Sequence, residues 1–238
     1  MDQNRKTAVA AGILFIVATS ASLAGDAVLG SALDTPDFLG TLSLAGNRVL
    51  VSALLSFVAA CTSAAIALAL YPVLRKFSEG WAIGSVGFRL IEGMFYGVST
   101  LCLLTMFALS RQAAAAGGQA ASYAQTLGHV LLAAKDLAGF VLAVMAFCIG
   151  AGSYYYVFYR SNLIPRWLSA WGLIALVLLF SAVMITLFDG EPYSVSGGLI
   201  FLALPIALQE MVLAVWLIAK GFNPSVVASL ADPAPAAA

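Results

Sequence analysis

Six long runs of apolar residues follow one another along the chain, separated by short polar segments. They cover residues 8–29, 50–71, 81–109, 131–158, 168–187 and 199–219. A helix needs about 20 largely apolar residues to cross the hydrocarbon core of a bilayer, and each run meets that length. The sequence therefore predicts an all-α protein, a polytopic bundle of six transmembrane helices.

The polar segments between and after these runs predict how the chain is organised. Residues 1–222 are expected to form a single six-helix transmembrane domain, followed by a C-terminal tail at 223–238. The last residues, 232–238, alternate proline with alanine and predict disorder, because such a segment buries no apolar surface. Segments 31–47 and 111–125 are expected to be loops or short surface helices.

The composition supports a membrane protein and excludes several other classes. The chain is 62% hydrophobic and only 9% charged, with a net charge of zero, whereas soluble domains carry about 25% charged residues. The lipid bilayer is therefore the predicted partner, and nucleic acid is not. The three cysteines lie in different apolar runs, so the sequence indicates neither a disulfide framework nor a cysteine metal site.

Basic residues predict the orientation of the bundle. Seven of them fall on one side of the six-helix topology, namely Arg5, Lys6, Arg75, Lys76, Arg160, Arg166 and Lys220, and only Arg48 and Arg111 fall on the other. Cytoplasmic loops of membrane proteins carry the excess of lysine and arginine. Both termini are thus predicted to be cytoplasmic.

The first apolar run has an alternative interpretation as a cleaved signal peptide. Arg5 and Lys6 precede it, and the segment Ser22-Leu23-Ala24 resembles a cleavage site. Its apolar core is longer than the usual 7 to 15 residues of a signal peptide, so we favour a retained helix. Sequencing the mature N-terminus would decide, since a start at Gly25 would contradict the six-helix prediction.

An arginine and a glutamate stand three residues apart within the third apolar run. Arg89 and Glu92 share one face of the expected helix, about 12 to 17 Å from its cytoplasmic end at 1.5 Å per residue. Each charge at the centre of a membrane helix costs about 2.5 to 3.5 kcal/mol. Glu210 lies at a similar depth in the sixth run, so we predict a buried polar site of these three residues.

Two hypotheses explain such a site. In the first, which we favour, Arg89, Glu92 and Glu210 form a structural ion pair or triad that fixes helix packing. In the second, Arg89 neutralises only one carboxylate and the other exchanges a proton, as in proton-coupled transporters.

Small residues predict where helices approach each other closely. Gly93 and Gly97 form a GxxxG pair on the face that carries the polar site. Gly139 and Gly150 belong to a second stripe of small residues in the fourth run. We predict that all four glycines lie at helix packing seams.

Further polar residues gather where the outer helix ends are expected. They are Asp26, Asn47, Arg48, His129, Lys135 and Asp136. They predict either a polar cluster that closes an external mouth or, as we favour, interfacial residues that cap helix ends. One histidine far from any cysteine supports no metal site, and no GxSxG elbow is present, so we predict no metal, cofactor or catalytic residue.

Several segments together resemble one known family. They are Leu70-Tyr71-Pro72-Val73-Leu74, Phe88-Arg89-Leu90-Ile91-Glu92, Tyr159-Arg160-Ser161 with Pro165, and Glu210 with Trp216-Leu217-Ile218-Ala219-Lys220-Gly221. In these the chain is similar to the bacterial membrane family described as domain of unknown function 4386, over about residues 6–222. The resemblance implies a multi-pass protein of the bacterial inner membrane with six or seven helices, and it implies no activity.

The sequence leaves three classes of function. The favoured one is a structural or interaction module that acts with a second copy or a membrane protein partner. The alternative is a small proton-coupled transporter that uses the intramembrane carboxylates. An intramembrane enzyme would need a nucleophile or a metal cluster, and the sequence indicates neither.

Overall fold

The computed structural model describes residues 3–116, 118–190 and 199–231 of the chain. Within these ranges the chain forms helices and no strands. The elements are α1 (Gln3–Leu29), the 3₁₀-helix η1 (Gly30–Leu33), α2 (Phe38–Leu44), α3 (Gly46–Leu74), α4 (Glu79–Ala116), α5 (Gly118–Asp136), the π-helix η2 (Leu137–Leu142), α6 (Ala143–Ser161), α7 (Arg166–Asp189), α8 (Ile200–Ala219) and α9 (Pro224–Ala231).

Six helical stretches are long and apolar enough to cross a membrane in the described part of the chain. One of them is composite, because α5, η2 and α6 run on as a single stretch over Ala120–Ser161. The predicted all-α polytopic bundle is therefore confirmed.

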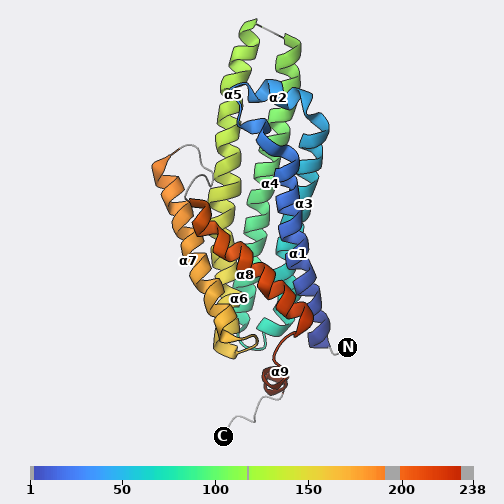
Figure 1. Ribbon diagram of the computed structural model, residues 1–238, viewed down its shortest axis with the longest axis vertical. Coiled ribbons are helices and arrows are strands. Elements are labelled where there is room, and N and C mark those ends of the chain that lie inside the picture. The colour runs from blue at the N-terminus through green and yellow to red at the C-terminus, as the bar shows by residue number, and fades with distance from the viewer. Residues whose placement is uncertain (1–2, 117, 191–198, 232–238) are drawn as a thin grey trace.

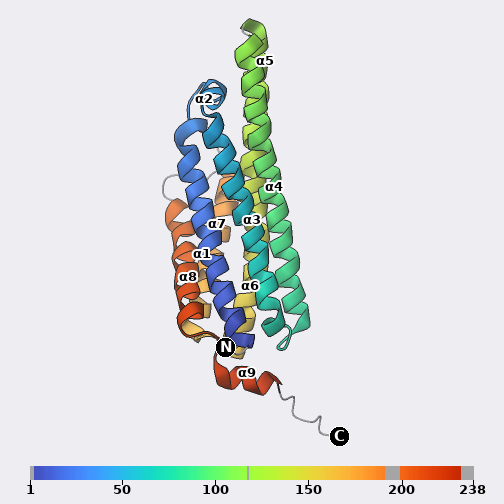
Figure 2. The ribbon, with the colours of Figure 1, turned by 90° about the vertical axis from the view of Figure 1, so that its right-hand side faces the viewer.

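The long helices form an elongated bundle with a closed ring of neighbours (Figures 1 and 2). Going round the ring, α1 packs against α3, α3 against α4, α4 against α6, α6 against α7 and α7 against α8. Contacts between α8 and α1 then close the ring. The start of α1 and the end of α8 lie at the same end of the molecule (Figure 1).

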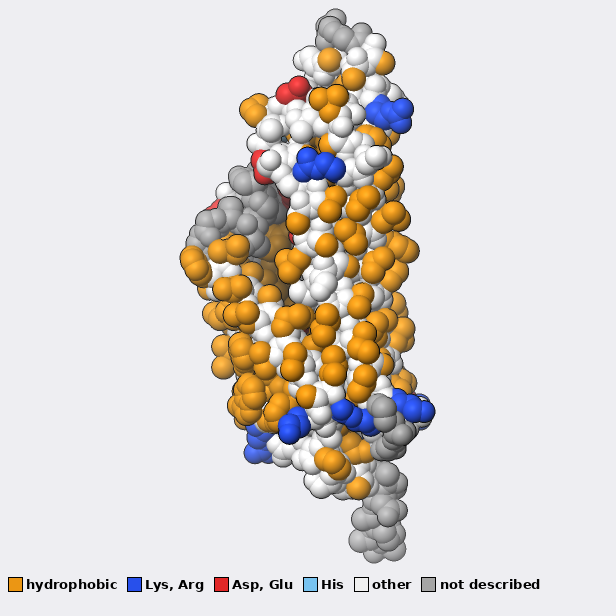
Figure 3. All heavy atoms as spheres, turned by 45° about the vertical axis from the view of Figure 1, so that its right-hand side comes forward, with side chains coloured by type: hydrophobic (Ala, Val, Ile, Leu, Met, Phe, Trp, Pro, Cys, Tyr) orange, Lys and Arg blue, Asp and Glu red, His pale blue; other side chains and the backbone are white. Residues whose placement is uncertain are grey.

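Charged residues divide the surface into bands. Lysine and arginine side chains gather at the end where α1 begins and α8 ends, which we call the basic end (Figure 3). A broad belt of hydrophobic side chains covers the middle, and charged side chains appear again toward the opposite, far end (Figure 3). Exposed leucines are found on the long helices, for example Leu54 on α3 and Leu101 on α4. Such a belt requires lipid contact, since soluble proteins rarely expose large apolar patches.

The interior holds two separate apolar cores. The larger includes Phe15, Tyr154, Phe158 and Leu213, and joins α1, α6 and α8 in the half near the basic end. The smaller forms at the far end, where α2 lays its buried Phe38, Leu39 and Leu42 against Leu103 and Met106 of α4. This arrangement leaves space between the two cores, and the candidate site occupies it.

Arg5 of α1 stabilises the contact between α1 and α8 that closes the ring. Its guanidinium donates hydrogen bonds to the carbonyl oxygens of Leu217 and Ile218, in the last turn of α8. A basic group suits this position because the carbonyl groups of the last helical turn have no partner within the helix. Close by, Gly12 lies against the backbone of Ala214, so α1 and α8 meet directly in this half of the bundle.

Two segments are more helical than the sequence indicated. Residues 111–116 extend α4 and residues 118–125 begin α5, and together these helices rise beyond the others (Figure 1). At about 1.5 Å per residue the 38 residues of α4 measure about 57 Å, well over the roughly 30 Å of a hydrocarbon core. The alanines of this segment favour helix without being apolar enough to predict a membrane span.

The tail begins with structure as well. Helix α9 (Pro224–Ala231) follows α8 directly, and the backbone amide of Asn223 donates a hydrogen bond to the carbonyl of Leu163 at 2.8 Å. Val227 of α9 belongs to the larger core. The disorder predicted for residues 232–238 falls outside the described residues.

Candidate functional site

Arg89 and Glu92 form a buried ion pair in the first half of α4. Their side chains approach to 3.0 Å between Nη1 and Oε2, and the residues are 2% and 3% exposed. The spacing of three residues places both on one helical face. The predicted ion pair is therefore present.

Helix α3 contributes hydrogen bonds to both members of this pair. The hydroxyl group of Ser63 donates a hydrogen bond to Glu92 Oε1 at 2.8 Å, and the backbone carbonyl of the same serine accepts one from Arg89 Nε at 3.3 Å. Arg89 also lies over the ring of Phe147 of α6, with 4.9 Å between Cζ and the ring centroid. The pair thus joins three helices, and its charges are compensated locally.

Glycines make room for this arrangement. An added Cβ at Gly150 would lie 3.1 Å from Cγ of Arg89, and one at Gly139 would lie 2.6 Å from Oγ of Ser99. Both positions therefore allow α6 and η2 to approach α4 closely. Gly93 is in ordinary contact with α3, at 3.5 Å from the carbonyl oxygen of Ala60.

Gly97 differs from the other three glycines. It is exposed, and an added Cβ would find no heavy atom within 4 Å among the described residues. The structure therefore places Gly97 outside the packing seam predicted for it, because no described helix comes into contact with this position.

A cavity of about 550 Å³ lies between the two apolar cores, next to the ion pair. Helices α1, α3, α4, α7 and α8 line it together with the end of α5, η2 and the start of α6. On this side the surface is hollowed between the α7–α8 pair and the rest of the bundle (Figure 3). Its volume lies within the range of about 300 to 1,000 Å³ typical of small-molecule sites.

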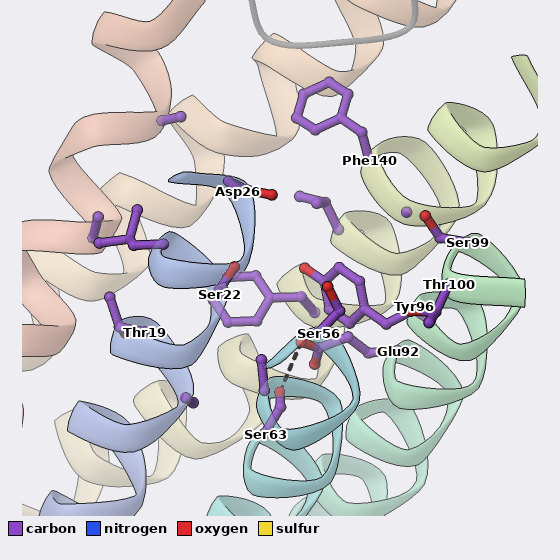
Figure 4. A pocket seen from close by; sticks show the side chains of 18 of the residues that line it. Thr19, Ser22, Asp26, Ser56, Ser63, Glu92, Tyr96, Ser99, Thr100 and Phe140 are labelled. Atoms are coloured by element: carbon purple, nitrogen blue, oxygen red, sulfur yellow. Dashed lines mark hydrogen bonds between the residues drawn. The ribbon is translucent and has the colours of Figure 1, made fainter. Parts of the chain in front are cut away.

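The walls of this cavity differ in chemistry. One wall consists of α1, α3 and α4 and carries hydroxyl groups, from Thr19, Ser22, Ser52, Ser56, Ser63, Tyr96, Ser99 and Thr100. Figure 4 shows Glu92 and Tyr96 reaching from α4 toward Ser56 and Ser63 of α3. The opposite wall, of η2, α6, α7 and α8, is largely apolar and includes Phe140, Val144, Leu179 and Ile206. The cavity is therefore amphipathic.

Glu210 belongs to the apolar wall. It lines the same cavity as Arg89 and Glu92, and the three lie within Coulombic range of one another. Within the described part of the chain Glu210 forms no ion pair, and its buried Oε1 has no hydrogen-bond partner. The three predicted site residues thus share one cavity, but only two of them are paired.

The predicted outer polar cluster is divided between two places. Asp26, Lys135 and Asp136 line the cavity, and Lys135 pairs with Asp136 at 3.0 Å between Nζ and Oδ1. Asp26 extends from α1 into this space (Figure 4). No hydrogen bond or ion pair engages its carboxylate within the described ranges.

The other three members of that cluster stabilise the far end of the bundle or lie on its surface. Arg48 donates to the carbonyl oxygens of Val28 and Leu29 at 2.8 and 2.9 Å, so it caps the C-terminus of α1. The ring of His129 packs edge-on against Phe38 of α2, with centroids 5.1 Å apart. Asn47 is exposed at the start of α3.

Sequence reasoning missed the serines of α3. Ser52, Ser56 and Ser63 stand four and seven residues apart, a spacing that places them on one helical face. This polar stripe in an apolar helix was the signal that could have identified Ser63 as a partner of the buried charges. No comparable signal exists for Phe140, which belongs to the π-helix η2 and also lines the cavity.

Comparison with known proteins identifies the family of the chain. The model of the family described as domain of unknown function (DUF4386) matches residues 10–221, and the chain belongs to this family. No curated protein and no solved structure matches it.

Proposed function

We propose that this protein is a small proton-linked carrier of the bacterial inner membrane, in which Glu210 exchanges a proton. The observation that supports this most strongly is the unpaired Glu210 carboxyl group in a cavity that it shares with the paired Arg89 and Glu92. Glu210 is half-buried, and its Oε1 atom is buried without a hydrogen-bond partner. Ionisation is costly for a carboxyl group in such a position, and protonation removes that cost. Ionisable groups at membrane depth commonly mark proton or ion pathways.

The orientation of the bundle gives this proposal a direction. The basic end carries the excess of lysine and arginine, so we assign it to the cytoplasm. The cavity then occupies the outer half of the bundle, from Asp26 down to Glu210. Below it the larger apolar core, with Phe15, Tyr154 and Phe158, separates it from the cytoplasm. We therefore interpret this arrangement as an outward-facing state of the proposed carrier.

The charged groups around Glu210 define how its proton is controlled. The ionisable groups that the surrounding elements contribute are Asp26 of α1, Arg89, Glu92 and Tyr96 of α4, Lys135 and Asp136 of α5, and Cys148, Tyr154 and Tyr155 of α6. Arg89 is paired with Glu92, and Lys135 with Asp136. Among the described residues, Arg89 acts on Glu210 only at longer range and no cation forms an ion pair with it. A proton or a bound cation can therefore neutralise Glu210.

A structural module is the second candidate function. It is favoured by the contacts of Ser63 with both Arg89 and Glu92, which fasten α3 to α4 at membrane depth. In that case the charges fix packing, and the lipid-facing surface would bind a second copy or a membrane protein partner. This candidate leaves the unpaired Glu210 without a role.

Proton movement across proteoliposomes separates the two candidates. The protein is reconstituted into vesicles with a trapped pH indicator, and a panel of small organic solutes is added under an imposed pH gradient. We expect solute-dependent proton movement in the wild type and its loss in Glu210→Gln. The matched control is Glu79→Gln, which removes the same charge at an exposed position outside the cavity. Movement that persists when both Glu92 and Glu210 are changed to glutamine would contradict the carrier.

A further inference from the structure

The charge and shape of the cavity point to a class of ligand. We infer that it binds an amphipathic organic monocation, a molecule with one positive group and an apolar body. This inference rests on the proposed function, in which the cavity takes up a solute, and specifies which solutes fit.

The charges that line the cavity favour a cation. Among the described residues, its lining has four carboxylates, Asp26, Glu92, Asp136 and Glu210, and two cations, Arg89 and Lys135. Each cation already forms an ion pair, one with Glu92 and the other with Asp136, both at 3.0 Å. The two carboxylates without such a pair are Asp26 on α1 and Glu210 on α8. With both ionised, the space between them carries an excess negative charge.

The same geometry disfavours an anion. Arg89 is only 2% exposed and is held by Glu92, Ser63 and the ring of Phe147. A ligand carboxylate would have to displace Glu92 from Arg89 and leave that glutamate buried without a partner. Removing one partner of a buried ion pair is strongly unfavourable.

The walls favour a ligand that is apolar over much of its surface. The rings of Phe15, Phe140 and Phe147 and the side chains of Leu179 and Ile206 all line the cavity. In Figure 4 Phe140 projects from η2 above Tyr96 and Glu92 of α4. A small hydrophilic ion would leave this apolar surface in contact with water, whereas an apolar body covers it. Aromatic faces also attract organic cations.

Glu210 links this ligand to the proton. A cation close to the Glu210 carboxylate stabilises its ionised form, so that binding releases the proton, and protonation in turn expels the cation. The proton and the organic cation then compete for Glu210, and each is carried when the other is absent. This reciprocity predicts that cation binding weakens as the pH falls.

Binding of tetraphenylphosphonium to the full chain tests the inference. The protein is held in phosphatidylcholine nanodiscs, and saturable binding of the radiolabelled cation is measured by equilibrium dialysis, with empty nanodiscs as background. Tetraphenylborate, an anion of the same shape, serves as the matched ligand. We expect saturable binding of the phosphonium that weakens at acid pH, and no competition by the borate.

Variants then locate the bound cation. We expect Asp26→Asn to weaken phosphonium binding by about tenfold or more, as for the loss of one charged contact. Asp34→Asn is the matched control, because Asp34 is exposed at the far end and does not line the cavity. Equal losses in the two variants, competition by the borate, or the absence of saturable binding would each overturn the inference.

The outcomes also distinguish this inference from the proposed carrier. Phosphonium binding without any solute-dependent proton movement would uphold the ligand class and contradict the carrier. Proton movement that requires Glu210, in a protein that does not bind the phosphonium, would uphold the carrier and overturn the ligand class. Circular dichroism and gel filtration of each variant confirm its fold, and the comparison of phosphonium with borate uses the wild type alone.

Discussion

At the scale of single residues, the ion pair of Arg89 and Glu92 couples the stability of the bundle to its site. Glu92 accepts from Ser63 and pairs with Arg89, so no atom of this cluster can be removed without leaving a buried partner uncompensated. Breaking a buried ion pair by removing one partner costs about 3 to 5 kcal/mol. The site therefore combines a fixed charged pair with the unpaired Glu210.

The structural role of the pair formed by Arg89 and Glu92 can be measured through the free energy of unfolding. We expect Arg89→Ala to lower the free energy of unfolding by about 3 to 5 kcal/mol, because it leaves Glu92 buried and charged. The double variant Arg89→Met with Glu92→Gln should recover most of the loss. Unfolding in mixed micelles is the measurement, with Lys76→Ala, at an exposed position in the turn after α3, as the control. A loss below about 1 kcal/mol, the range of surface ion pairs, would contradict a structural role for the pair.

The sequence predicted this site only in part. Arg89 and Glu92 lie three residues apart on one helix, so their contact follows from helical geometry alone. The depth of Glu210 was equally predictable, and all three residues do line one cavity. That Glu210 forms no ion pair with a described residue depends on how α8 is placed relative to α4, which no local pattern specifies.

At the scale of elements, the contact between α1 and α8 depends on Gly12. An added Cβ there would lie 2.7 Å from both the carbonyl oxygen of Ala214 and Cγ1 of Ile218. We expect Gly12→Ala to destabilise the bundle by about 1 to 3 kcal/mol, the usual effect of overpacking. The measurement is thermal unfolding in detergent.

The chain offers a matched control for this substitution. Gly97 also lies within a long helix, but an added Cβ there meets nothing within 4 Å in the described structure. Gly97→Ala should therefore be neutral or stabilising by up to about 1 kcal/mol, through helix propensity. Equal destabilisation by both changes would show that close packing at Gly12 is not the cause.

The membrane-spanning helices could be predicted from the sequence, because the length of an apolar run is enough to identify them. All six apolar runs became membrane-length helices, because each supplies about 20 apolar residues. The sequence left the segment past the predicted spans of α4 and α5 open between a loop and a short surface helix, since its alanines and glutamines are moderately polar and yet helical. The π-helix at Leu137–Leu142 was not predicted. A π-helix has wider turns than an α-helix, and a run of six apolar residues shows no pattern that distinguishes the two.

At the scale of the whole molecule, the direction of the cavity depends on the orientation of the bundle in the membrane. We expect the basic end in the cytoplasm and the α4–α5 hairpin outside. The test uses single cysteines at Lys76 and at Ser122, in a background where Cys61, Cys102 and Cys148 are replaced. An impermeant maleimide should label intact spheroplasts at position 122 only, and position 76 only after permeabilisation. The reverse pattern would place the cavity on the cytoplasmic side.

The closed ring of helices could not be predicted from the sequence. Short connections after α3 and α6 predict that neighbours in the chain pack side by side. The ring closes, however, between α1 and α8, the first and last of the six membrane-length stretches. The cavity arises from this closure, because α1 and α8 contribute Asp26 and Glu210 to opposite walls. A site formed by residues so far apart becomes visible only in three dimensions.

The central claim is that the Glu210 carboxyl group exchanges a proton within the cavity. Infrared difference spectroscopy during a pH titration in lipid measures this directly, because the protonated carboxyl group has its own stretching band. We predict that the wild type and the Glu79→Gln control show a protonated carboxyl band that disappears as the pH rises, and that Glu210→Gln lacks it. A titrating band that persists unchanged in Glu210→Gln, or a wild type without such a band, would contradict the claim.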